Sequence, residues 1–196
     1  MHKGRLEAFS DGVIAIIITI MVLEMKVPKG HDLSALAPMV PTFLSYVLSF
    51  VFVGIYWNNH HHMLQATNKV DGGVLWANLH LLFWLSVVPF VTSWMGESHF
   101  AAWPVALYGV VLLGSALAYT ILANLLSRLH GDASVLARAR AAKSNVKEWG
   151  SVALYAAAIP LAFVNRWISC ALFVTVAIIW LIPDRRIVEA MRTNPE

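Results

Sequence analysis

The chain has 196 residues, of which 59% are hydrophobic and 13% are charged, with a formal net charge of +3. Soluble domains average roughly 45–50% apolar and about 25% charged residues, so this composition indicates an integral membrane protein and not a soluble domain. The basic residues flank apolar runs, where they meet anionic lipid headgroups, so we expect membrane lipid as a partner and no nucleic acid.

Apolar runs long enough to cross a hydrocarbon core of roughly 30 Å recur along the chain. They predict an all-α fold in which residues 1–196 form one domain of six transmembrane helices. The predicted helices are 6–27, 38–64, 71–94, 101–127, 148–165 and 167–182, with a polar cytoplasmic loop at 128–147. The single cysteine, Cys170, excludes an intrachain disulfide and a two-cysteine redox motif.

Basic residues predict the orientation, because Lys and Arg gather in short cytoplasmic loops. If the N-terminus is cytoplasmic, 11 of the 14 basic residues fall on that side of the membrane, and only Lys26, Lys29 and Arg166 fall on the other. Both termini of this multi-pass protein are therefore expected to be cytoplasmic.

The first predicted helix carries an apolar stripe. At about 100° per residue, Gly12, Ile16, Thr19, Ile20 and Leu23 lie close together on one side of the helix. Packing against lipid or neighbouring helices explains such a stripe. The alternative is a pore, in which several copies of the helix stack apolar rings that close by dewetting.

Asp11 lies where this apolar run begins, and it points away from the stripe. Burying a carboxylate at membrane depth costs free energy unless the group is paired with another residue, hydrated or part of a functional site. The second predicted helix ends on the same side of the membrane at Trp57, His60 and His61. We therefore expect Arg5 and these histidines to be the candidate partners of Asp11.

Motifs in the first half of the chain resemble a known family. The first helix contains Arg5-x-x-x-Phe9-Ser10-Asp11, followed by Thr19 and Leu23-Glu24. The later matching segments are Leu48-Ser49-Phe50, Trp57-x-x-His60-His61, Asn78 and Pro89-Phe90. In this order they resemble the lysosomal potassium channel family known as transmembrane protein 175, especially its bacterial members.

This resemblance implies a potassium-preferring cation channel of the bacterial plasma (inner) membrane, with K⁺ as the permeant ion and no cofactor. Its subunits are expected to form a homo-oligomer, a tetramer in bacterial members, in which the first helix of each subunit lines the pore. By position relative to the motif, the hydrophobic gate falls on Ile16, Ile20 and Leu23. Thr19 matches a pore-facing threonine that gives modest selectivity.

The same residues predict a polar network that holds the subunit together. Its expected members are Arg5, Phe9, Ser10, Asp11, Trp57, His60, His61 and Asn78. A buried carboxylate is tolerated when it is hydrogen-bonded and charge-balanced, so we interpret this network as structural and not catalytic.

The histidines at 60–62 do not predict a metal site. Adjacent helical positions diverge by about 100°, so consecutive side chains cannot converge on one ion. His60 and His61 are either neutral hydrogen-bond partners or groups that titrate near neutral pH.

Two other classes of protein are alternatives to a channel. An intramembrane enzyme would use Asp11, His60 and His61 as acid–base groups, but the sequence shows no nucleophile beside a base and no second carboxylate expected at membrane depth. A secondary transporter usually shows internal repeats and broken helices, whereas this chain has no repeat and no proline in its first helix. We therefore predict a channel and not an enzyme.

Overall fold

The computed structural model describes residues 3–67, 69–130 and 145–181. Five helices in this part of the chain are long and apolar enough to cross a membrane. They are α1 (Lys3–Leu23), α2 (Val40–Gln65), α3 (Gly72–Glu97), α4 (Ala102–His130) and α6 (Asn145–Leu181), with a 3₁₀ helix η1 (Leu33–Met39) before α2. The described residues contain no strand, which confirms the all-α class.

Several predicted boundaries differ from those observed. Helix α1 ends at Leu23 and not at residue 27, and Pro28 disfavours helical geometry at Val27. Helix α3 continues past 94 to Glu97 and stops where His99 and Phe100 adopt positive φ angles of 51° and 59°. Helices α4 and α6 extend into the predicted loop at 128–147, of which residues 131–144 lie outside the described part.

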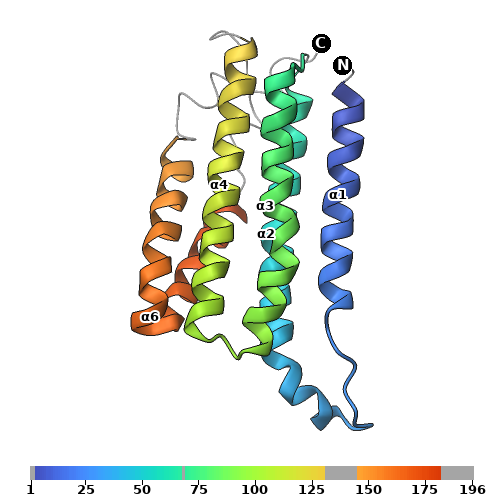
Figure 1. The fold of residues 1–196 in the computed structure, drawn as a ribbon, viewed down its shortest axis with the longest axis vertical. Helices are drawn as coiled ribbons and strands as arrows, with labels where there is room; N and C mark the ends of the chain where they lie inside the picture. The colour runs from blue at the N-terminus through green and yellow to red at the C-terminus, as the bar shows by residue number, and fades with distance from the viewer. Residues whose placement is uncertain (1–2, 68, 131–144, 182–196) are drawn as a thin grey trace.

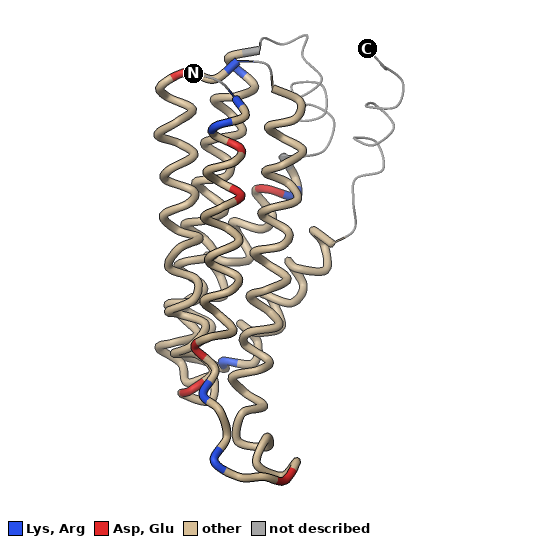
Figure 2. The backbone as a smooth tube through the Cα atoms, turned by 90° about the vertical axis from the view of Figure 1, so that its right-hand side faces the viewer, with Lys and Arg blue, Asp and Glu red and all other residues tan. Residues whose placement is uncertain are grey.

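The helices stand side by side in an elongated bundle (Figure 1). Helix α1 lies at one edge and α6 at the other, while α3 packs against both α1 and α4 in between. Charged residues gather toward the two ends, and the middle of the bundle is almost free of them (Figure 2). This distribution is the one expected of a helical bundle in lipid.

Helix α6 reverses its direction at Asn165, where φ is −156° and ψ is 106°. Ser169 Oγ donates to the Ala158 carbonyl at 2.7 Å, and Trp180 Nε1 donates to Ser151 Oγ at 2.8 Å. Residues 29 positions apart in a straight helix would be separated by about 43 Å. The two halves of α6 therefore lie next to each other as a hairpin.

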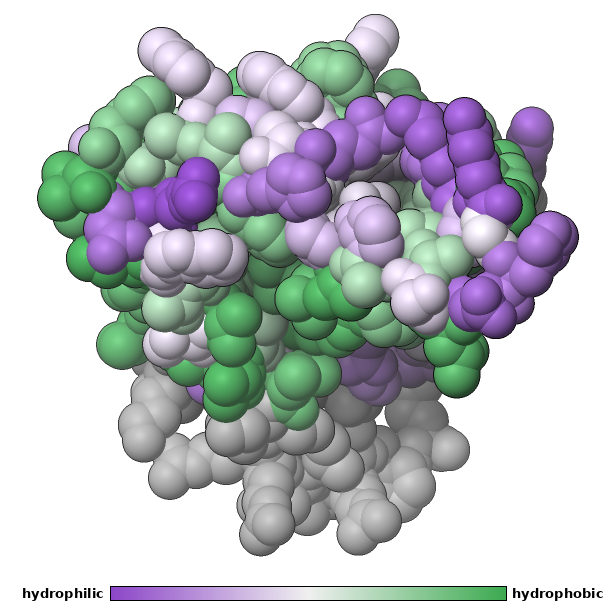
Figure 3. Space-filling model, turned by 90° about the horizontal axis from the view of Figure 1, so that it is seen from below, coloured by the Kyte–Doolittle hydropathy of each residue, from purple (hydrophilic) through white to green (hydrophobic). Residues whose placement is uncertain are grey.

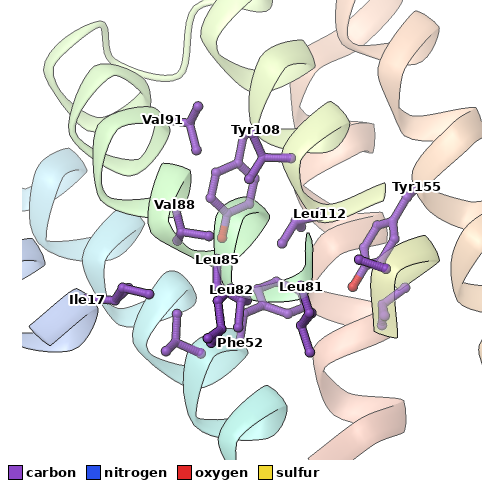
Figure 4. Packing of buried hydrophobic residues seen from close by; sticks show 14 of the residues in the cluster. Ile17, Phe52, Leu81, Leu82, Leu85, Val88, Val91, Tyr108, Leu112 and Tyr155 are labelled. Carbon is purple, nitrogen blue, oxygen red and sulfur yellow. The ribbon is translucent and has the colours of Figure 1, made fainter. Parts of the chain in front are cut away.

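The core is built around α3 and α4. Side chains from the buried faces of α2, α3, α4 and α6 converge there, as Figure 4 shows for Phe52, Leu85, Val88, Leu112 and Tyr155. Glycine brings α3 and α4 very close together: a Cβ added at Gly114 would overlap the indole ring of Trp84. Small residues at such contacts let helix backbones approach closely in membranes.

An ion pair joins two segments at the end of the bundle away from the N-terminus. Lys26 Nζ lies 2.6 Å from Glu97 Oε1 and ties the segment after α1 to the end of α3. The hydrogen bond and the charge of Glu97 raise the pKa of Lys26 above its usual value of 10.5. Figure 3 shows this end, where hydrophilic residues form an arc over a largely hydrophobic body.

Candidate functional site

Helix α1 has two distinct faces. Its buried face contains Leu6, Ser10, Ile14, Ile17 and Met21, which pack into the bundle. The opposite face carries the predicted gate residues. Their side chains are 58% exposed at Ile16, 40% at Ile20 and 79% at Leu23. The single subunit thus leaves the predicted gate face of α1 uncovered.

Thr19 lies on the same exposed face, between Ile16 and Ile20. Its hydroxyl donates to the carbonyls of Ala15 at 3.1 Å and Ile16 at 2.9 Å. Because a hydroxyl has one proton and two lone pairs, the oxygen lone pairs remain free to face outward. The exposed oxygen of Thr19 is therefore suited to contact a cation.

A groove of about 750 Å³ separates α1 from α3 beside this face. Ile16 and Ile20 line its α1 side, and Ser86, Ser93 and Glu97 contribute polar atoms from α3. Sequence reasoning missed the α3 side of the groove. The signal was present, because spacings of seven and four residues place 86, 93 and 97 on one face of a helix.

The buried part of the predicted network is a chain of hydrogen bonds that joins three helices. His60 Nε2 lies 2.7 Å from Asn78 Oδ1, and Asn78 Nδ2 donates to Ser10 Oγ at 3.0 Å. Ser10 Oγ in turn donates to the Leu6 carbonyl at 2.8 Å. Since an amide oxygen only accepts, His60 must carry its proton on Nε2. All three side chains are buried, so the chain locks α1 to α2 and α3.

The second part of the network lies nearer the surface. Trp57 Nε1 donates to Asp11 Oδ1 at 3.0 Å, and the Trp57 ring stacks on His61 with centroids 5.8 Å apart. Arg5 and Phe9 are exposed, and Arg5 forms no ion pair with any residue in the described ranges. The structure thus brings Asp11 to Trp57 and leaves Arg5 apart from it.

A second hydroxyl chain, which sequence reasoning missed, crosses the middle of the bundle. Thr92 Oγ1 donates to the Val88 carbonyl at 2.7 Å, so it must accept from Ser49 Oγ, 2.6 Å away. Ser49 then accepts from Tyr108 OH at 3.0 Å. The chain joins α2, α3 and α4, and its only sequence signal was the presence of hydroxyls inside apolar runs.

These features define a class: a multi-pass helical membrane protein with an uncovered apolar face on its first helix and polar residues that join helices. A family model described as "Endosomal/lysosomal potassium channel TMEM175" matches residues 5–89. A potassium channel of Chryseobacterium sp. is 55% identical over 194 residues. The aligned region covers 99% of this chain and 100% of the Chryseobacterium protein.

A solved structure and an animal relative agree with this match. The crystal structure of a lysosomal potassium-selective channel TMEM175 homolog from Chamaesiphon minutus superposes with a TM-score of 0.77, at 28% identity and 98% coverage of both chains. The endosomal/lysosomal proton channel TMEM175 of Homo sapiens is 37% identical over 81 residues, which are 35% of this chain and 16% of that protein. The chain belongs to the TMEM175 family, whose members are ion channels and not enzymes.

Proposed function

We propose that this protein is a potassium channel that conducts K⁺ passively through the central pore of a homo-oligomer, a tetramer, in the bacterial plasma membrane. The observation that carries the proposal is the uncovered apolar face of α1, which is exposed at Ile16, Ile20 and Leu23. The relative from Chryseobacterium, named a potassium channel and aligned over 99% of this chain, supports the same function.

We further propose that each subunit crosses the membrane six times, with both termini in the cytoplasm. The hairpin at Asn165 divides α6 into two antiparallel halves, so five long helices supply six crossing segments. The excess of basic residues on one side supports the orientation.

In this proposal, symmetry-related copies of α1 place Ile16, Ile20 and Leu23 in successive rings around the axis. Apolar constrictions of this kind stop ions because water leaves a narrow hydrophobic passage. The Thr19 hydroxyl, with its proton donated to the α1 backbone, offers an oxygen to a partly dehydrated cation. One such ring gives a modest preference for K⁺ over Na⁺.

The proposal is tested by ion flux through purified protein in liposomes. Ile16→Ala should raise K⁺ flux at least about threefold, because a smaller side chain widens and wets an apolar constriction. Ile178→Ala is the matched control, since Ile178 is a similarly exposed isoleucine on α6. We expect no change in flux for this control.

Two results would contradict the pore assignment. One is the absence of K⁺ flux under any gradient in protein that is folded and assembled. The other is unchanged conductance when Ile16, Ile20 and Leu23 are replaced together by alanine.

A further inference from the structure

A group of charged side chains lies where α1 and α3 end, at the end of the bundle that Figure 3 views. It consists of Glu24, Lys26 and Glu97, which we call the charge cluster. Glu24 and Glu97 line the same groove as the proposed gate residues Ile16 and Ile20. The cluster therefore lies at one end of the face that carries the proposed ion path.

Both carboxylates of the cluster are held by helix ends. Glu24 directly follows the proposed gate residue Leu23, and its backbone N–H donates to the Ile20 carbonyl at 3.1 Å, as in the last turn of a helix. Glu97 is the last residue of α3. Because regular backbone hydrogen bonds hold these two positions, the fold fixes where each carboxylate lies relative to the proposed ion path.

Lys26 interacts with both carboxylates but forms an ion pair with only one of them. Its Nζ lies 2.6 Å from Glu97 Oε1. This hydrogen bond and the charge of Glu97 are the main causes that raise the pKa of Lys26, and the charge of Glu24 raises it further. Glu24 forms no ion pair within the described residues. Lys26 thus neutralises Glu97 and leaves Glu24 as the uncompensated carboxylate of the cluster.

The ion pair of Lys26 and Glu97 is exposed to solvent. The side chains are 81% and 47% exposed, and ion pairs in water contribute little to the free energy of unfolding. A charge beside a narrow passage has a larger effect on ions, because clefts lined by one sign of charge raise the local concentration of counter-ions by about tenfold or more. Changing the net charge of the cluster should therefore alter the supply of cations more than the stability of the fold.

We propose that Lys26 sets the supply of K⁺ at this entrance of the pore by neutralising Glu97. Each subunit then presents a net charge of −1 from the cluster, and not the −2 that two uncompensated carboxylates would give. The inference rests on the proposed channel function, and it extends that function from the gate on α1 to the entrance formed by the ends of α1 and α3.

The test measures tracer K⁺ flux in liposomes with equal KCl inside and outside, so that the cluster meets the same salt in either orientation. Flux is compared with that of the wild type at about 0.01 M and about 1 M KCl, where the screening lengths are roughly 30 Å and 3 Å. At the low concentration, Lys26→Gln should raise flux at least about twofold, because it leaves two uncompensated carboxylates. Glu97→Gln should lower it at least about twofold, because Lys26 then offsets Glu24. At the high concentration both variants should match the wild type, because salt screens the cluster.

The matched control is the double variant in which Lys26→Gln and Glu97→Gln are combined. It removes the ion pair but restores the wild-type net charge, so it should restore wild-type flux at the low concentration. The conservative variant Lys26→Arg keeps the charge and should do the same. If the ion pair only held α1 to α3, both single variants and the double variant would change flux in one direction at both concentrations. That result would overturn the proposal.

Failure of this inference is distinguishable from failure of the channel function. Assembled wild-type protein without K⁺ flux at either concentration would overturn both. Wild-type flux that Ile16→Ala raises and Lys26→Gln leaves unchanged at about 0.01 M KCl would overturn only the role of Lys26. If one single variant failed to assemble, the other would still decide, because the two are expected to shift flux in opposite directions.

Discussion

At the scale of single residues, two hydrogen-bond chains of the same design join the helices. Each has a defined direction, because each ends by donating to a carbonyl of its own helix: Ser10 to Leu6 in one chain and Thr92 to Val88 in the other. Within the part of the chain that the structure describes, no fully buried polar side-chain atom is left without a partner. This complete pairing is what makes polar residues tolerable at membrane depth.

The hydrogen-bond chain of Tyr108, Ser49 and Thr92 allows the effect of removing its first hydroxyl, that of Tyr108, to be predicted. Tyr108→Phe should lower the free energy of unfolding by about 1 kcal/mol, because Ser49 loses the donor it accepts from while the ring stays packed against Phe173. Equilibrium unfolding in mixed micelles measures this change. Tyr46→Phe is the control, since the structure shows no hydrogen bond from its hydroxyl within the described residues. Equal effects of both variants would contradict a role for the chain.

At the scale of elements, the contact between α3 and α4 depends on one position without a side chain. A Cβ at Gly114 would overlap the Trp84 ring, whose Nε1 is already held by His80 Nε2 at 3.0 Å. The ring cannot move away without breaking that hydrogen bond, so the two helices must separate instead. Close packing of α3 on α4 therefore requires glycine at 114.

This contact predicts a large difference between two glycine substitutions. Gly114→Ala should destabilise the protein by at least about 2 kcal/mol, as overpacking of a tight core does. Gly54→Ala in α2 meets nothing within 4 Å and should be neutral or stabilising by up to about 1 kcal/mol. Thermal unfolding of both variants in the same detergent makes the comparison. A neutral Gly114→Ala would show that α3 and α4 are not held this closely.

At the scale of the whole molecule, α1 is packed on one side only. It contacts α2 and α3, and the network residues Ser10 and Asp11 hold it there through Asn78 and Trp57. Its other side is uncovered in the subunit, as a helix around a shared axis would be. The network and the proposed pore thus use opposite faces of one helix.

This division of roles predicts that Asp11→Ala lowers assembly more than it changes ion preference. Loss of the Asp11 acceptor frees Trp57 and loosens α1, on which the oligomer axis depends in our proposal. Light scattering after size exclusion measures assembly, and reversal potentials with K⁺ and Na⁺ measure preference. Glu7→Ala, which removes only the surface pair with Lys3, serves as the control. Stable oligomers with altered preference would place Asp11 in the ion path instead.

The helical fold and the apolar face of the first helix could be predicted from the sequence alone, because the membrane imposes simple requirements. Long apolar runs must be helices, since backbone groups find no partners in lipid, and the 3.6-residue period places Ile16, Ile20 and Leu23 on one side. The end of α2 and the start of α3 lie beside the start of α1, and there Asn78 contacts both His60 and Ser10.

Only the tertiary structure decided which polar groups meet. Asp11 bonds to Trp57 while Arg5 stands apart, Tyr108 reaches Ser49, and Glu148 is buried in the first turn of α6. Periodicity defines the face of one helix, but it does not define how far neighbouring helices shift along their axes. The first helix was therefore predictable by itself, whereas the hydrogen bonds of Ser49 with Thr92 and Tyr108 depend on how α2, α3 and α4 pack.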